Sequence, residues 1–224
     1  YSNSGDAACN SIYDFTSGEC TNISDNPCPS ISILLSQGWN MIGFYCSENT
    51  NALNAFAAIQ DKIIIAKDGV GNAYLPDWDF NGIGELNNLE GYQIKVSVNC
   101  TLIIEGQLIA PENSSIPILQ GWNIISYLRE NSANAELVLE DISETLIIVK
   151  DFLGNAYLPN WNFNGIGDFE AGQGYQLKAS SATELHYISN DSEYRISEQQ
   201  KIENKTTNIY FNLNTGSNMH LIIP

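Results

Sequence analysis

The stretch GNAYLPDWDFNGIG, Gly71–Gly84, occurs a second time in the chain as GNAYLPNWNFNGIG, Gly154–Gly167. The two copies are identical except at Asp77 and Asp79, which the second copy replaces with asparagine. A loop that uses charge for catalysis or metal binding is not expected to lose both carboxylates. A loop defined by its backbone shape tolerates the change, because Asp and Asn are similar in size and make the same local turns.

The repeat extends beyond this loop at constant spacing. SQGWNMIGFY (36–45) matches LQGWNIISYL (119–128), and GYQIK (91–95) matches GYQLK (174–178). Both pairs are 83 residues apart (119 − 36 and 174 − 91), so neither copy has gained or lost a residue between them. A fixed internal period indicates a duplicated structural unit. Such a unit serves either to build a larger structure from two packed copies or to provide two equivalent binding sites with enhanced avidity.

The repeat divides the chain into five segments. These are an N-terminal segment with three cysteines (1–30), a first repeat module (31–106), a linker (107–116), a second repeat module (117–189) and a C-terminal extension (190–224).

Each module is expected to consist mainly of strands with one short helix. The runs NALNAFAAI (51–59) and NAELVLEDI (134–142) place apolar residues at helical spacing behind an asparagine that can serve as N-cap. The β-branched runs at 63–66 and 146–149 predict buried strands. The sequence therefore predicts a strand-dominated α+β fold with two tandem similar small domains and a C-terminal β-hairpin.

The predicted hairpin lies in NIYFNLNTGSNMHLIIP (208–224), where apolar residues alternate on either side of TGSN. The alternating residues are Ile209, Phe211, Leu213, Met219, Leu221 and Ile223. Such a hairpin can cap a sheet edge within the chain. It can also add strands to a neighbouring subunit, in which case it would support assembly into a homopolymer.

Composition limits the classes of function. The 224 residues carry a formal net charge of −17 and only 9 Lys and Arg, which argues against nucleic acid or an anionic membrane surface as partner. No apolar run reaches the length that spans a bilayer, so membrane insertion is not expected. The sequence starts at Tyr1 rather than Met, which is the pattern expected of a processed, secreted chain.

The chain has five cysteines, and none of them forms a CxxC pair of the kind that binds zinc. Cys46 and Cys100 of the first module are replaced by Arg129 and Thr183 in the second, and their joint loss predicts a disulfide between them. Two of the three N-terminal cysteines can pair, as Cys9–Cys20 or Cys20–Cys28, and the third then remains free or bonds to another molecule. The cysteines of the predicted disulfide framework are Cys9, Cys20, Cys28, Cys46 and Cys100. Disulfides of this kind favour an extracellular location.

Two ligand sites can be read from the duplicated loop. Asp77, Asp79, Asn81 and Glu85 follow the opening of a calcium loop, although the second copy loses most of the charge. The aromatic residues can form a sugar-binding platform in each module, or they can simply belong to the core and turns. The candidate platform residues are Tyr74, Trp78, Tyr157 and Trp161. In the alternative interpretation, Trp78, Phe80 and Ile83 anchor the loop onto the core.

An enzyme is not expected. The chain has two histidines, and His186 replaces Ile103 of the first module, so it has no counterpart there. Asp68 and Asp151 are kept in both copies, but each follows a lysine at the end of a predicted strand and is expected to shape a turn. No catalytic motif or cofactor signature is visible.

The pattern GWN…KD..GNAYLP…FNGIG…GYQIK resembles repeats in secreted and cell-surface proteins of Bacteroidetes-like environmental bacteria. The resemblance covers both modules but not the two flanks, and it implies a secreted or cell-surface protein without indicating an activity. Together with the hairpin and the odd cysteine, it predicts a structural subunit of a surface filament. The alternatives are a carbohydrate-binding or adhesive module, and a calcium-dependent interaction module.

Overall fold

The alternation of apolar and polar residues in this chain produces short antiparallel strands in the computed structural model, which describes residues 30–46, 50–106 and 108–190. The N-terminal cysteines 9, 20 and 28 and the predicted C-terminal hairpin lie outside the described residues. The described residues from 30 to 188 belong to one compact unit. We call its two halves the first module (30–106) and the second module (108–188).

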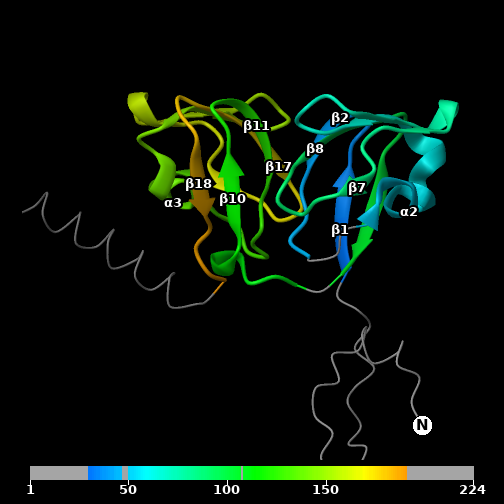
Figure 1. Cartoon of the computed structure of the whole chain (residues 1–224), viewed down its shortest axis with the longest axis horizontal. Coiled ribbons are helices and arrows are strands. Elements are labelled where there is room, and N and C mark those ends of the chain that lie inside the picture. The colour runs from blue at the N-terminus through cyan, green and yellow to red at the C-terminus, as the bar shows by residue number, and fades with distance from the viewer. Residues whose placement is uncertain (1–29, 47–49, 107, 191–224) are drawn as a thin grey trace, which may run out of the picture. The chain divides into compact units, whose positions relative to one another are not determined.

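The first module contains nine strands, a short α-helix and two 3-10 helices among the described residues (Figure 1). The strands are β1 (Ser30–Leu35), β2 (Gly38–Ile42), β3 (Thr50–Asn51), β4 (Ile63–Lys67), β5 (Ala73–Leu75), β6 (Phe80–Asn81), β7 (Glu85–Leu86), β8 (Tyr92–Val96) and β9 (Cys100–Glu105). The helices are α2 (Ala52–Phe56), η1 (Ala57–Lys62) and η2 (Pro76–Trp78).

The second module repeats these elements after the 3-10 helix η3 (Pro111–Asn113). Its strands are β10 (Ser115–Ile118), β11 (Gly121–Ser126), β12 (Ala133–Asn134), β13 (Leu146–Lys150), β14 (Ala156–Leu158), β15 (Phe163–Asn164), β16 (Asp168–Phe169), β17 (Gly174–Ala179) and β18 (Thr183–His186). Its helices are α3 (Ala135–Val138), η4 (Glu140–Ile142) and η5 (Pro159–Trp161). None of the helices in the described ranges is long and apolar enough to cross a bilayer.

The two modules have sheets of the same order. A five-stranded antiparallel sheet runs β2-β8-β4-β5-β6 in the first and β11-β17-β13-β14-β15 in the second. Two-stranded ladders, β1-β9 and β10-β18, stand beside these sheets. The prediction of a strand-dominated fold is therefore confirmed.

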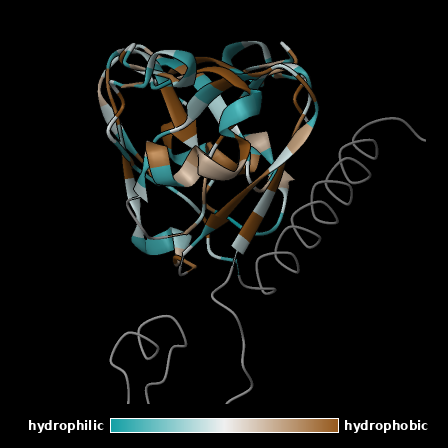
Figure 2. Cartoon of the chain, turned by 90° about the vertical axis from the view of Figure 1, so that its right-hand side faces the viewer, coloured by the Kyte–Doolittle hydropathy of each residue, from teal (hydrophilic) through white to brown (hydrophobic). Residues whose placement is uncertain are grey.

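Period-two alternation explains how each sheet forms its core. In β1, Ile31, Ile33 and Leu35 are buried while the intervening residues are exposed, as expected for a strand with one face inward. Figure 2 shows apolar stretches along the strands, next to more hydrophilic loops and a short helix. The buried residues form one apolar cluster per module rather than a single shared core.

The predicted N-caps are confirmed. The Asn51 side chain accepts a hydrogen bond from the backbone N–H of Leu53, and Asn134 accepts one from Glu136. Each bond satisfies one of the backbone donors that a helix start leaves without a partner. These helices have only five and four residues, so burial of Phe56 and Val138 in the two cores contributes more to their stability than helix propensity does.

The modules contact each other through reciprocal backbone bonds. Gly43 N donates to Gly172 O at 3.1 Å, and the equivalent residue Ser126 donates through its backbone N to Leu89 O at 3.4 Å. Isolated antiparallel bridges join Ile42 to Gln173 and Glu90 to Ile125. Because every residue in the second contact is the 83-residue equivalent of one in the first, the junction has the self-complementary character of a two-fold interface.

Candidate functional site

The duplicated loop forms a tight turn that is the same in both modules. Pro76 starts η2, and Asp79 then adopts a left-handed conformation with φ of 48°. In the second module Asn162 has φ of 49° at the same place. Asp and Asn are the residues other than glycine that most readily take this conformation. The Asp→Asn change is therefore compatible with an unchanged turn, as the sequence predicts.

The aromatic side chains of this turn face solvent. Trp78 is 81% exposed and Phe80 is 51% exposed, and the values for Trp161 and Phe163 are 80% and 51%. The prediction that Trp and Phe anchor the loop onto the core was wrong, since only Ile83 and Ile166 pack against the two cores. The αL residue between Trp78 and Phe80 reverses the chain, so the alternation of a straight strand does not apply here.

Phe80 lies over the loop itself. A β-carbon on Gly82 would come within 2.9 Å of the Phe80 ring, and Gly165 has the same relation to Phe163 at 3.0 Å. Glycine lets the aromatic ring lie over the backbone here, and a larger residue would have to displace the ring. The result is a turn that presents its Trp while one Phe covers the backbone.

The two tyrosines of the predicted aromatic platform are not at the surface. Tyr74 is 1% exposed and Tyr157 is 5% exposed, each inside the core of its module. Burial, and secondarily the Asp79 carboxylate, raise the pKa of the Tyr74 phenol. Of the candidate platform residues, Trp78 and Trp161 are therefore exposed, as are the neighbouring Phe80 and Phe163, while Tyr74 and Tyr157 belong to the two cores.

A polar network fixes the turn to the start of the helix. Asn81 Oδ1 accepts from Gly84 N at 2.9 Å, and Asn81 Nδ2 donates to Asn51 Oδ1 at 3.1 Å. Asn51 is also the N-cap of α2, and Ala52 N donates to Gly84 O at 2.9 Å. Asn164, Asn134 and Gly167 repeat these contacts in the second module. The turn is consequently held at both ends.

Two of the four residues of the calcium candidate, Asn81 and Glu85, have a side-chain oxygen engaged in this network. Asn81 Oδ1 is bonded to Gly84, and Glu85 Oε1 accepts from Asn51 Nδ2 at 2.9 Å. Over the described ranges, no group of three or more His, Cys, Asp or Glu is placed to hold a metal ion. Calcium binding through Asp77, Asp79, Asn81 and Glu85 stays a prediction.

The predicted Cys46–Cys100 disulfide stays a prediction. Cys46 forms an isolated bridge with Leu108, and Cys100 is the first residue of β9. Both cysteines contact the core of the first module.

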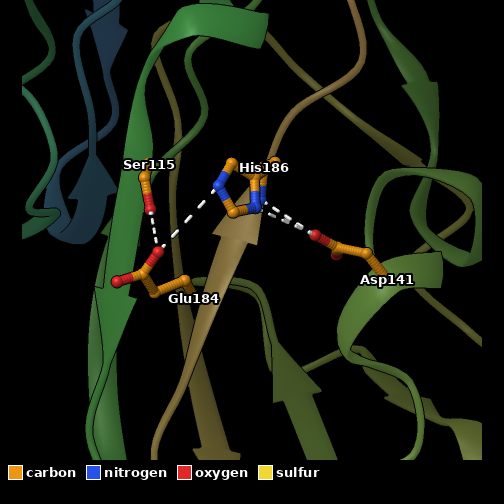
Figure 3. Close-up of polar contacts among 4 residues, drawn as sticks. All are labelled: Ser115, Asp141, Glu184 and His186. Carbon is orange, nitrogen blue, oxygen red and sulfur yellow. Dashed lines mark hydrogen bonds and ion pairs between the residues drawn. The ribbon is translucent and has the colours of Figure 1, made fainter.

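His186 lies between two carboxylates on the surface of the second module (Figure 3). Its Nδ1 is 3.6 Å from Asp141 Oδ2, and its Nε2 is 4.0 Å from Glu184 Oε2. Ser115 Oγ donates to Glu184 at 3.0 Å rather than to the histidine. A nucleophilic serine is activated by a direct hydrogen bond to its base, so this exposed group links β10, β18 and η4 without forming a nucleophile–base pair.

The sequence does not show the lysines that surround a second pair of exposed tryptophans. Trp39 and Trp122 are 46% and 48% exposed on the outer faces of the five-stranded sheets. Lys67 and Lys95 lie 5.7 and 5.8 Å from the centre of the Trp39 ring, and Lys150 and Lys178 lie 5.6 and 5.7 Å from that of Trp122. The tryptophans lie in the repeated GWN motifs, and Lys95 and Lys178 lie in GYQIK and GYQLK. Only the register between the strands shows that these residues are neighbours.

No protein-family model matches the chain, and no curated protein or solved structure shows significant similarity to it. The resemblance to repeats of secreted bacterial surface proteins therefore stays a prediction. Functional inference depends on the geometry of the chain itself.

Proposed function

We propose that the chain is a non-enzymatic extracellular binding protein whose two modules each present an aromatic turn to a glycan. The observation that carries this proposal is the exposure of Trp78 and Trp161, at 81% and 80%, on turns of the same conformation. Contiguous exposed apolar surface marks interaction sites, and each Trp is followed two residues later by a Phe that is 51% exposed.

The construction of the turns favours binding. Each turn is bounded by a proline at the start of its 3-10 helix and by an asparagine bonded to the helix N-cap. A preformed site loses little conformational entropy when a ligand binds, so more of the contact energy remains as affinity. The second turn has Asn160 and Asn162 in place of Asp77 and Asp79 and keeps the same conformation. This is consistent with a binding site that does not depend on charge.

A sugar ring fits this surface by its chemistry. The faces of pyranose rings carry C–H groups that stack on an indole, and their edges carry hydroxyls for polar partners. Trp78 has Asp77 and Asp79 beside it in the chain, and Trp161 has Asn160 and Asn162. Two such sites in one molecule would raise the affinity for a polymer through effective concentration.

The remaining elements of the proposal rest on the sequence. We infer that the modules are tandem copies of one small domain and that the C-terminal extension forms a β-hairpin. The cysteine content supports secretion and at least one disulfide. The resemblance to repeats of bacterial surface proteins agrees with this location.

Assembly into a surface filament is the second candidate. The exposed Trp78 and Trp161 turns favour it as well, because each could dock on another copy of the chain instead of a glycan. The proposed hairpin would supply a further contact by strand addition. In this case the partner would be a homopolymer rather than a sugar.

The test compares the wild type with Trp78→Ala, Trp161→Ala and the double variant on a panel of soluble and insoluble polysaccharides. Each single variant should weaken binding to a polymeric glycan, and the double variant should abolish it. Leu34→Ala, which removes an apolar side chain that is 82% exposed on β1 and outside the turn, is the matched control and should bind normally. Wild-type protein that binds no glycan but forms particles lost in the double variant would replace this proposal with assembly.

A further inference from the structure

The two Trp–Lys groups on the outer sheet faces form a site distinct from the aromatic turns. Trp39 on β2 lies opposite Lys95 on β8 in the ladder, and Gln93 of β8 lies opposite Lys67 on β4. In the second module the same pairs are Trp122 with Lys178 and Gln176 with Lys150. Residues two apart on a strand share a face, so Lys95 and Gln93 present their side chains beside one another.

The concentration of positive charge is unusual for this chain. Lys67, Lys95, Lys150 and Lys178 are four of only 9 Lys and Arg in a protein with 26 acidic residues. Within the described ranges, none of the four forms an ion pair with an acidic residue; the ion pairs there belong to His186. The ammonium groups lie over indole rings instead, at 5.6 to 5.8 Å from their centres.

The adjacent aspartates, Asp68 and Asp151, form no ion pair with these lysines in the described residues. Asp68 directs its oxygens to Val70 N, Asn72 N and Asn72 Nδ2, and Asp151 makes the same contacts with Asn155 N and Nδ2. This confirms that both aspartates shape a turn. Their carboxylates bond to the loop that follows the strand, so the ammonium groups of the neighbouring lysines can contact a ligand directly.

A cavity beside Trp122 adds hydroxyl-binding groups to the charge. Its volume is about 220 Å³, and Trp122 contributes to its wall. Its polar lining is provided by Asn87, Glu90 and Asn123. Amide and carboxylate oxygens accept hydrogen bonds from hydroxyl groups. Asn123 Oδ1 and Asn87 Oδ1 already accept from Leu119 N and Leu89 N. The Glu90 carboxylate is therefore the group in this wall that can accept from a ligand hydroxyl, and it would repel a plain anion.

We propose that the Trp39–Gln93–Lys95–Lys67 and Trp122–Gln176–Lys178–Lys150 groups bind the carboxylated sugar rings of an acidic polysaccharide. The indole stacks on the ring, the two ammonium groups bind the carboxylate, and the glutamine amide binds a hydroxyl. A cation–π contact at the surface contributes only about 0.5–1 kcal/mol. The ammonium groups can therefore leave the indole at little cost and bind the carboxylate of the ligand. This site does not depend on the turns at Trp78 and Trp161.

The experiment titrates the full chain with a short oligogalacturonate and with its methyl ester, which has the same ring without the charge. The free acid should bind at least tenfold more tightly than the ester. The paired change Lys95→Gln with Lys178→Gln should weaken binding at least tenfold, and Lys95→Arg with Lys178→Arg should restore it. Trp39→Ala with Trp122→Ala should also weaken binding although all charges remain, and Lys62→Gln should leave it unchanged.

Several outcomes would overturn the proposal. They are absence of binding, equal affinity for the ester, and equal affinity for polyglutamate or a thymidine oligonucleotide, which would show simple attraction of anions. Circular dichroism and thermal unfolding of each variant separate loss of binding from loss of folding. If Trp78→Ala and Trp161→Ala leave oligogalacturonate binding intact while the lysine variants lose it, the turns have no part in it and the sheet-face site stands alone.

Discussion

Gly43 lies against Ser126, which is its own equivalent in the second module: a β-carbon on Gly43 would fall 2.7 Å from the Ser126 Cα. Ser126 Oγ accepts from Phe44 N at 3.1 Å and donates to Glu90 O at 2.7 Å. Contact between equivalent residues is what the axis of a two-fold interface requires. In this chain the first module has a glycine at this position and the second has a serine. The Ser126 hydroxyl fills the space between the two modules, and no room is left for a side chain on residue 43.

Gly91 provides the first test of this junction. A β-carbon there would meet Ile125 O at 2.6 Å, which is backbone and cannot move aside cheaply. We expect Gly91→Ala to destabilise the unit by about 1–3 kcal/mol through overpacking, measured by urea unfolding. Gly69→Ala is the matched control, because its β-carbon would meet Ile124 at an ordinary 3.5 Å. Equal midpoints for the two variants would show that the modules do not depend on this contact.

Glu90 provides a second test at the same junction. Burial, and secondarily the Asp68 carboxylate, raise the pKa of Glu90. A carboxyl group with a raised pKa in the folded state destabilises that state above this pKa, and the effect disappears as pH falls towards the unfolded value. Glu90→Gln should therefore raise the melting temperature at pH 7 by less than about 3 °C, with a smaller gain at acidic pH.

The second module supports this substitution, because Gln173 occupies the equivalent position and makes the reciprocal bridge to Ile42. Glu112→Gln changes the net charge equally at an exposed site and should leave the melting temperature unchanged. A gain that is constant from pH 4 to pH 8 would contradict the electrostatic explanation.

Tyr74 provides a third test, in the core of the first module. Its hydroxyl is buried and has no hydrogen-bond partner among the described residues. Removing an unsatisfied buried group is neutral or favourable, so Tyr74→Phe should keep or raise stability by up to about 1 kcal/mol. Tyr92 is the contrast, since its hydroxyl accepts from Asn87 N at 2.6 Å. Tyr92→Phe should cost about 1–3 kcal/mol in thermal unfolding, and a loss of similar size in Tyr74→Phe would indicate a partner for its hydroxyl.

These features differ in how far sequence patterns can predict them. The strands and the N-caps Asn51 and Asn134 were predictable, because alternation and capping are local properties. The exposure of Trp78 was not, because it lies in a 3-10 turn that ends at the left-handed residue Asp79, where the alternation of a strand does not apply. The lysines around Trp39 and the reciprocal junction depend on register between strands distant in sequence, which a single sequence does not specify.

Asn81 provides a fourth test, of the network that holds the aromatic turn. Its amide bonds both to Gly84 and to the helix N-cap Asn51. Asn81→Ala should cost about 1–2 kcal/mol, comparable with loss of a helix cap, and should lower glycan binding by loosening the turn. Trp78→Ala should by contrast leave stability within about 0.5 kcal/mol, because this side chain is largely exposed. Binding and chemical unfolding measured together separate the two effects.

The fifth test returns to the two aspartates that distinguish the duplicated loops. The double change Asp77→Asn with Asp79→Asn makes the first loop identical to the second over Gly71–Gly84. Because Asn takes the left-handed conformation at least as readily as Asp, stability should stay within about 0.5 kcal/mol. Thermal unfolding in calcium and in chelator should give the same midpoint for both proteins. If calcium raises the melting temperature of the wild type and not that of the double variant, the carboxylates bind the metal. Calcium binding would then explain why the first loop has aspartates where the second has asparagines.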